Sequence, residues 1–192
     1  MNAARSLLAT DREYLDHERR SETKNEFVNG EILAMSGGRP VHNAVCSNLN
    51  AAFHSRLRGR PGRPTTSDQR VHVPATGAYF YPDVTVVCGR AEYHPDDDMA
   101  LVNPSVVVEV LSPTTESYDR GIKPAHYRHM PTIGEFALVV PETETVEHYV
   151  RTGPDRWSLT EYRRSDVVPF ATLCIEIPVA ELFEDLDIVR GG

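Results

Sequence analysis

Hydrophobic residues follow two different spacings along this 192-residue chain, and the spacings predict both helices and strands. Between residues 42 and 58 they recur at helical spacing, on Val45, Leu49, Ala52, Phe53 and Leu57. This spacing predicts an amphipathic helix. Charged residues 11–24 predict an earlier helix, with Thr10 or Asp11 as its N-cap. Two later helices are predicted at about residues 120–129 and 179–182.

Short apolar or alternating segments predict strands at residues 69–73, 81–88, 105–111, 136–140, 146–151 and 157–162. Residues 105–111 are almost all valine and leucine, which is typical of a strand buried on both faces in the middle of a sheet. Asn29-Gly30 lies between apolar pairs, and this dipeptide is a strong hairpin signal. The order of elements predicts a mixed α/β (α+β) fold, in which helices flank one central mixed β-sheet.

The composition limits the class of protein. A chain of this length buries roughly 70% of its unfolded surface, which allows one compact core, and we expect a single domain over residues 1–192. Three cysteines lie far apart, at Cys46, Cys88 and Cys174, which favours reduced thiols over disulfides or a zinc knuckle. Because no signal-peptide pattern or apolar run of about 18 residues is evident, we expect a cytoplasmic protein without a membrane span.

The charge is unevenly distributed, although the net charge is −8. Residues 1–96 carry 12 basic and 11 acidic side chains, whereas residues 97–192 carry 8 and 17. This balance argues against a protein that coats nucleic acid non-specifically. The first half nevertheless contains a basic stripe that is a candidate for docking a DNA backbone, formed by Arg56, Arg58, Arg60, Arg63 and Arg70. The alternative is a solvated arginine-rich loop, and the acidic run 96–98 also predicts a solvated loop.

Two carboxylates stand out in the predicted buried strands. Glu109 lies among valines, where an unpaired carboxylate costs several kcal/mol, and Asp83 lies at the head of strand 81–88. If the two strands are neighbours, the two acids and the backbone carbonyl of Val110 would suit Mg²⁺ or Mn²⁺. Each acid also has a structural alternative. Glu109 would face solvent or form a salt bridge, and Asp83 would accept backbone N–H groups.

Weaker candidates surround this pair. Pro124 favours the start of a helix, which places Lys123 on the first turn of helix 120–129. There the ammonium would hold a water and offset charge on a phosphate. Glu31 after the hairpin turn and His42 at its helix start would reach the same site. A surface or capping role is the alternative for all three residues. His126 and His129 are spaced to share a transition metal, but no third ligand is evident.

Several short motifs occur in a fixed order: residues 25–32, His42, residues 82–84, residues 108–114, and Asp119-Arg120 with Lys123 and Tyr127. Together they resemble the Uma-two family of proposed restriction endonucleases, within the PD-(D/E)XK nuclease superfamily, over about residues 12–185. The resemblance implies a restriction-endonuclease-like core with Asp83 and Glu109 as metal ligands. The lysine usual two residues after the glutamate is replaced by Leu111, and the resemblance implies that Lys123 substitutes for it.

The predicted function is therefore a Mg²⁺-dependent (or Mn²⁺-dependent) endonuclease that hydrolyses phosphodiester bonds of DNA, with a homodimer as the candidate assembly. One alternative is a catalytically inactive protein of the same fold that binds nucleic acid or a protein partner. A second is a metallohydrolase that uses His126 and His129. A third is an interaction protein of the toxin–antitoxin kind, whose partner surface would be the acidic second half.

Overall fold

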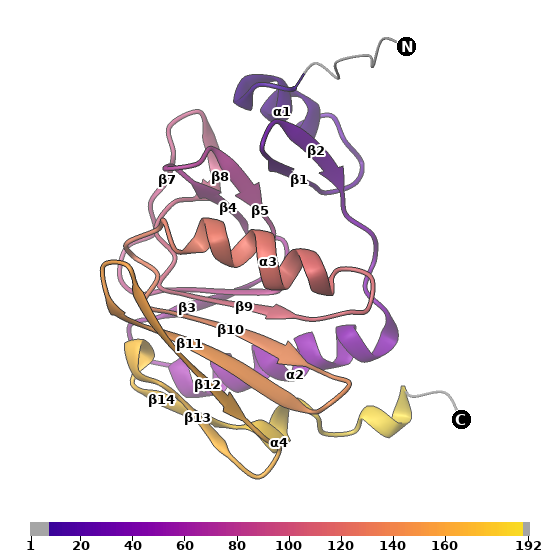
Figure 1. Ribbon diagram of the computed structural model, residues 1–192, viewed down its shortest axis with the longest axis vertical. Coiled ribbons are helices and arrows are strands. Elements are labelled where there is room, and N and C mark those ends of the chain that lie inside the picture. The colour runs from indigo at the N-terminus through magenta and orange to yellow at the C-terminus, as the bar shows by residue number, and fades with distance from the viewer. Residues whose placement is uncertain (1–7, 190–192) are drawn as a thin grey trace.

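The computed structural model describes residues 8–189, and six of its strands form a central mixed sheet in the order β12-β11-β10-β9-β6-β3 (Figure 1). These strands are β3 (Arg63–Thr66), β6 (Val84–Val87), β9 (Val106–Val110), β10 (Glu135–Val140), β11 (Thr145–Gly153) and β12 (Arg156–Tyr162). β9 runs parallel to β10, and the other neighbouring strands are antiparallel. Every residue of β9 is buried, as its run of valines predicts.

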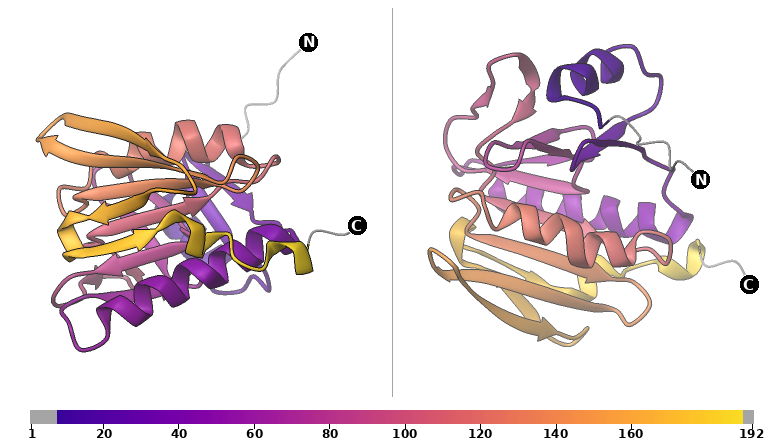
Figure 2. Two further views of the ribbon diagram at one scale, coloured as in Figure 1. Left: turned by 90° about the horizontal axis from the view of Figure 1, so that it is seen from below. Right: turned by 45° about the horizontal axis from the view of Figure 1, so that its top comes forward.

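Two helices cover opposite faces of this sheet (Figures 1 and 2). α2 (Pro40–Leu57) packs its buried face against Val84 and Val108, and it confirms the predicted helix 42–58. α3 (Glu116–Tyr127) packs on the other face, where Tyr127 joins the core cluster that contains Val107. The arrangement confirms the predicted class, a mixed sheet flanked by helices.

A second six-stranded sheet exists beyond the one central sheet that the sequence predicts, and its strand order is β2-β1-β5-β4-β8-β7. Its strands are β1 (Asn25–Val28), β2 (Glu31–Ala34), β4 (Arg70–Val73), β5 (Ala78–Phe80), β7 (Tyr93–His94) and β8 (Asp97–Leu101). The solvated loop predicted at residues 96–98 is wrong for Asp97, which begins β8 and is buried 3.3 Å from Arg70, whereas Asp96 and Asp98 are exposed. β4 confirms the predicted strand 69–73, but most strands of this sheet are too short to show a clear period.

Local signals explain the N-terminal elements. α1 (Asp11–Glu18) is shorter than predicted, and Thr10 caps it in a capping box with Glu13. The β1–β2 hairpin turns at Asn29 and Gly30, whose φ angles are 53° and 85°. Both angles lie in the left-handed region that this tight hairpin turn requires, which is why the Asn-Gly signal predicted it correctly.

Two boundaries differ from the prediction and affect the site. The segment predicted as strand 81–88 becomes a strand only at Val84, so Asp83 lies between β5 and β6. α3 begins at Glu116, so Lys123 does not lie on its first turn, and Pro124 lies inside the helix. Proline removes one N–H donor but keeps a helical φ, so a helix can continue through it at some cost. Pro124 therefore does not mark the start of α3, and the predicted start at about residue 120 is wrong.

The C-terminal segment packs along α2. β13 (Val167–Phe170) and β14 (Ile175–Pro178) form a hairpin, interrupted by a 3₁₀ turn at Ala171–Leu173. α4 (Val179–Leu182) confirms the predicted last helix, and a 3₁₀ turn follows at Leu186–Ile188. The predicted domain over 1–192 includes residues 1–7 and 190–192, which lie outside the described residues. Within residues 8–189, no helix is long and apolar enough to cross a membrane.

Candidate metal centre

Asp83 connects three elements at the end of the central sheet. Val84 of β6 pairs with Val108 of β9, so the antiparallel register places Asp83 opposite Glu109. Asp83 Oδ2 accepts the backbone N–H of Val110 at 2.8 Å and lies 3.3 Å from His42 Nε2, on the first turns of α2. The structure therefore brings together Asp83, Glu109 and His42, as the sequence predicts.

Glu109 points away from α2 and toward α3. Its neighbours Val108 and Val110 face the α2 side of the sheet, so the alternation of a strand turns Glu109 to the other face. There Oε1 accepts the Tyr127 hydroxyl at 2.6 Å, and Oε2 accepts Lys123 Nζ at 3.1 Å. The carboxylate is only 4% exposed. Both of its oxygens consequently have protein partners.

Lys123 joins three acids. Its Nζ lies 3.1 Å from Glu109, 3.1 Å from Asp119 and 3.2 Å from Glu26. Asp119, Lys123 and Tyr127 are spaced by four residues, so they lie on one face of α3 and point at β9 together. Lys123 thus reaches the end of the Glu109 strand from further along the helix than expected. Its side chain is 6% exposed, so it is not a surface lysine.

The charges in this cluster are not balanced. Burial raises the pKa of Glu109 well above its usual value, and Lys123 only partly opposes that effect. Burial also acts to raise the pKa of Asp83, but hydrogen bonds from His42 and Val110 hold it below its usual value. Burial acts to lower the pKa of Lys123, yet the surrounding carboxylates raise it well above normal. Several buried carboxylates thus share one ammonium, an arrangement that attracts a cation.

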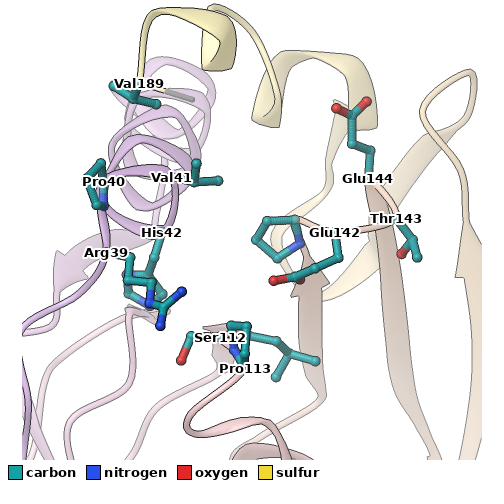
Figure 3. A pocket seen from close by; sticks show the side chains of 12 residues that line it. Arg39, Pro40, Val41, His42, Ser112, Pro113, Glu142, Thr143, Glu144 and Val189 are labelled. Atoms are coloured by element: carbon teal, nitrogen blue, oxygen red, sulfur yellow. The ribbon is translucent and has the colours of Figure 1, made fainter. Parts of the chain in front are cut away.

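The acids open into a cavity of about 410 Å³ whose lining includes Asp83, Glu109, Asp119 and Lys123. A neighbouring hollow of about 670 Å³ shares some of that lining, including His42. Figure 3 shows this second hollow between the start of α2, with Pro40 and Val41, and the β10–β11 turn, with Glu142 and Thr143. The two hollows therefore meet beside His42, which gives an extended ligand room on both sides of the acids.

Glu31 is not among the residues that the structure brings together. It lies exposed on β2 and does not line the cavity that holds Glu109. Glu26, five residues earlier on β1, instead contacts Lys123 and accepts the backbone N–H of Tyr81 at 3.0 Å. Sequence reasoning missed Glu26 as a site residue. The signal that identified Glu109, a charged residue inside an apolar run, is absent around Glu26, because its strand has the sequence Asn-Glu-Phe-Val and is buried only in the folded protein.

The predicted basic stripe lies at the far end of α2. Arg58, Arg60 and Arg63 are exposed there, whereas Arg56 pairs with Glu181 at 2.6 Å. Arg70 is buried beside Asp97 and is not part of this surface. The helix rises 1.5 Å per residue, so the arginines begin about 20 Å from His42. They do not converge on the acids.

The histidine pair on and after α3 gains no third ligand among the described residues. His126 Nδ1 lies 2.8 Å from the Thr76 hydroxyl, and His129 is exposed. A group of three potential metal ligands does occur elsewhere, at His42, Cys46 and Asp83.

Comparison with known proteins assigns this chain to a family of proposed nucleases. The chain belongs to the Uma2 family, described as "Putative restriction endonuclease", which matches residues 11–180 and confirms the resemblance to the Uma-two family. Two uncharacterized proteins of Synechocystis sp., sll1609 and slr1290, are 34% and 31% identical to it. These alignments cover 84% and 91% of this chain, and 91% and 90% of the relatives.

A solved structure supports the fold. The crystal structure of a "putative nuclease belonging to DUF820" from Anabaena variabilis matches with a TM-score of 0.74. It is 19% identical, and the match covers 91% of this chain and 97% of that chain. At this identity, the likeness shows a shared fold.

Proposed function

We propose that this protein is a Mg²⁺- or Mn²⁺-dependent endonuclease that hydrolyses phosphodiester bonds of DNA. The observation that carries the proposal is the placement of Asp83 opposite Glu109, in a cavity where several acids share Lys123. Membership of the Uma2 family supports a nuclease in general terms. Two carboxylates on neighbouring strands, with surplus negative charge around them, are what a hard divalent cation needs.

The proposed metal ligands are Asp83, Glu109 and the backbone carbonyl of Val110. Oxygen donors suit Mg²⁺ and Mn²⁺. The N–H of Val110 points at Asp83, and in a strand the carbonyl of the same residue leaves on the same side as its N–H. A bound ion would lower the pKa of its water and stabilise negative charge on the phosphate.

The surrounding residues would orient the acids and the substrate. Lys123 and Tyr127 hold the two oxygens of Glu109, and His42 holds Asp83 and lines the cavity, where it is placed to contact a phosphate or accept a proton. In this proposal, Lys123 holds Glu109 in place as a metal ligand, and its ammonium offsets negative charge that develops on the phosphate. The exposed arginines Arg58, Arg60 and Arg63 would contact the DNA backbone away from the metal.

Nicking of supercoiled plasmid DNA tests the proposal. We expect wild-type protein to nick with Mg²⁺ or Mn²⁺ and to stop with a chelator. Asp83→Asn and Glu109→Gln should each lose at least about 10³-fold in rate, about 4 kcal/mol of transition-state stabilisation. Glu161→Gln, on the exposed strand β12, is the matched control and should nick normally. No nicking by wild type with either ion, or normal nicking by Asp83→Asn, would contradict it.

One observation favours the alternative of a catalytically inactive protein that binds nucleic acid or a protein partner. The three carboxylates around Lys123 can use all three of its N–H donors, so each of these acids has a charged partner without a metal. Calorimetric titration with Mn²⁺ separates the two functions. A catalytic centre predicts binding that Glu109→Gln weakens, whereas the alternative predicts DNA binding without metal binding or cleavage.

A further inference from the structure

Cys46 lies one helical turn after His42 on α2 and faces the same corner of the site. Its Sγ lies 3.6 Å from Nδ1 and 4.0 Å from Nε2 of His42. His42 Nε2 in turn lies 3.3 Å from Asp83 Oδ2. Ligand atoms of the three residues all lie within 4.8 Å of one another. Asp83 and His42 also belong to the nuclease centre proposed above, whereas Cys46 has no role in it.

The separations fit the coordination sphere of a tetrahedral ion. With Zn–N and Zn–O bonds of about 2.0 Å and a Zn–S bond of about 2.3 Å, tetrahedral angles hold N and O about 3.3 Å apart and S and N about 3.5 Å apart. The His42–Asp83 separation of 3.3 Å already has this value. The Sγ–Nε2 separation of 4.0 Å is a few tenths longer, within reach of a small rotation of the Cys46 side chain.

The donor set also selects the class of metal. Thiolate and imidazole prefer zinc over magnesium, whereas Glu109 and the Val110 carbonyl offer only hard oxygen donors. His42 and Asp83 both line the cavity of about 410 Å³, so a fourth ligand such as water can reach the ion from that side. Three protein ligands and one open position are typical of a zinc site that is accessible from solution.

We propose that His42, Cys46 and Asp83 form a Zn²⁺ site that overlaps the Mg²⁺ centre at Asp83. On binding, the Cys46 thiol releases its proton to solvent, and its sulfur binds the ion as a thiolate. His42 binds as a neutral imidazole, with its one ring proton on Nδ1 and the lone pair of Nε2 on the ion. Zn²⁺ at this position occupies Asp83, so that Asp83 can no longer bind Mg²⁺, and Zn²⁺ thereby inhibits the nuclease. The inhibition depends on the proposed function, whereas the binding of Zn²⁺ does not.

Co²⁺ can replace Zn²⁺ as a spectroscopic probe, because a thiolate ligand gives a sulfur-to-cobalt absorption band in the near ultraviolet. We expect this band when metal-free, full-length protein is titrated with Co²⁺, and we expect Zn²⁺ to abolish it. Cys46→Ser should lose the band. Cys88→Ser is the matched control and should keep it, since Cys88 is partly buried against the same core cluster as Cys46. Circular dichroism checks that both variants fold.

Two results would overturn the site: no sulfur band in wild-type protein, or a band that survives Cys46→Ser. A second measurement tests the overlap. Millimolar Mg²⁺ should weaken the apparent Co²⁺ affinity of wild type at least about threefold, and an unchanged affinity would overturn the sharing of Asp83. The cobalt band uses neither DNA nor Mg²⁺, so its outcome is separate from the outcome of the plasmid assay, whereas the competition measurement rests on the proposed Mg²⁺ centre. A protein that shows the band but never nicks would refute only the nuclease and its inhibition.

Discussion

Glu109 and Glu135 are two buried glutamates on neighbouring parallel strands, and they differ in almost everything else. Glu109 lies near the end of β9, and Glu135 is the first residue of β10, opposite Val106. Glu135 accepts His148 Nε2 at 2.7 Å and the backbone N–H of Thr172 at 2.5 Å. It does not line the cavity that contains Glu109. Glu135 thus has partners that no other acid uses, whereas Glu109 shares Lys123 with Glu26 and Asp119.

Their pKa values move in opposite directions for that reason. Burial acts to raise the pKa of Glu135, but hydrogen bonds from His148 and Thr172 bring it below its usual value. Burial raises the pKa of Glu109, and the neighbouring acids add to the effect while Lys123 opposes it. A buried carboxylate alone is therefore weak evidence for a metal centre. Competition among acids for one cation, at the wall of a cavity, is much stronger evidence.

Removing the shared cation should have the largest effect. Lys123→Met leaves Glu26, Glu109 and Asp119 without their ammonium, and we expect the free energy of unfolding to fall by about 3–5 kcal/mol. Mg²⁺ or Mn²⁺ should restore part of this loss by supplying positive charge. Urea denaturation with and without metal measures both effects. Lys24→Met is the control, since Lys24 pairs with the exposed Asp68 and should cost under about 1 kcal/mol. Equal losses in the two variants would refute the role of Lys123.

Removing charge from Glu135 should reduce stability but leave activity intact. Glu135→Gln weakens the buried hydrogen bonds to His148 and Thr172, and we expect a loss of about 2 kcal/mol in the free energy of unfolding. Nicking by the folded protein should match wild type. Glu109→Gln should show the reverse pattern, with activity lost and little stability lost. If Glu135→Gln abolishes nicking without unfolding the protein, the contrast between the two glutamates fails.

Glu26 and Glu31 allow a smaller test of which acid belongs to the centre. Glu26→Gln removes one charged partner of Lys123, and we expect nicking to fall about tenfold, or about 1.4 kcal/mol. Glu31→Gln should change the rate less than twofold, because Glu31 is exposed on β2. The plasmid assay measures both variants. The opposite ranking would favour Glu31, which the sequence alone suggests.

The pH dependence of stability should separate the two buried glutamates by sign. Glu135 has a folded pKa below its unfolded value of about 4.3, so its contribution is present at neutral pH and is lost as pH falls through the folded pKa. Glu109 has a raised folded pKa, so its contribution is present at low pH and is lost as pH rises through that pKa.

Urea denaturation at pH 7 and pH 4 measures these contributions to the free energy of unfolding, and each pKa unit of difference corresponds to about 1.4 kcal/mol. Acidification should narrow the gap in unfolding free energy between wild type and Glu135→Gln. It should raise the unfolding free energy of wild type relative to that of Glu109→Gln. The same sign for both variants would contradict the assignment.

The sequence allowed the central elements to be predicted because their signals are local. A run of valines marked β9 as an interior strand, helical spacing marked α2, and Asn29-Gly30 marked the first hairpin. The sequence left open whether the Asp83 and Glu109 segments are neighbours, and the pairing of β6 with β9 shows that they are.

The second sheet was predicted only in part, through the β1–β2 hairpin and the alternating segment that forms β4. Its other strands have two to five residues and carry no clear period, and the acidic run that begins β8 resembles a loop until Arg70 is placed beside Asp97. Pro124 gave a misleading local signal, because packing keeps α3 helical through it. Glu26 and Glu31 differ by five residues, and only the hairpin decides which one turns inward.

By itself, the sequence determined the main helices, the strands of the central sheet, and the buried position of Glu109 in β9, because hydrophobic period and turn chemistry act over a few residues. Only the tertiary structure decided that Glu26, Glu109 and Asp119 share Lys123. It also decided that Cys46 meets Asp83 through His42. Such clusters join residues that are distant along the chain, and the packing of helices on two sheets sets their separations.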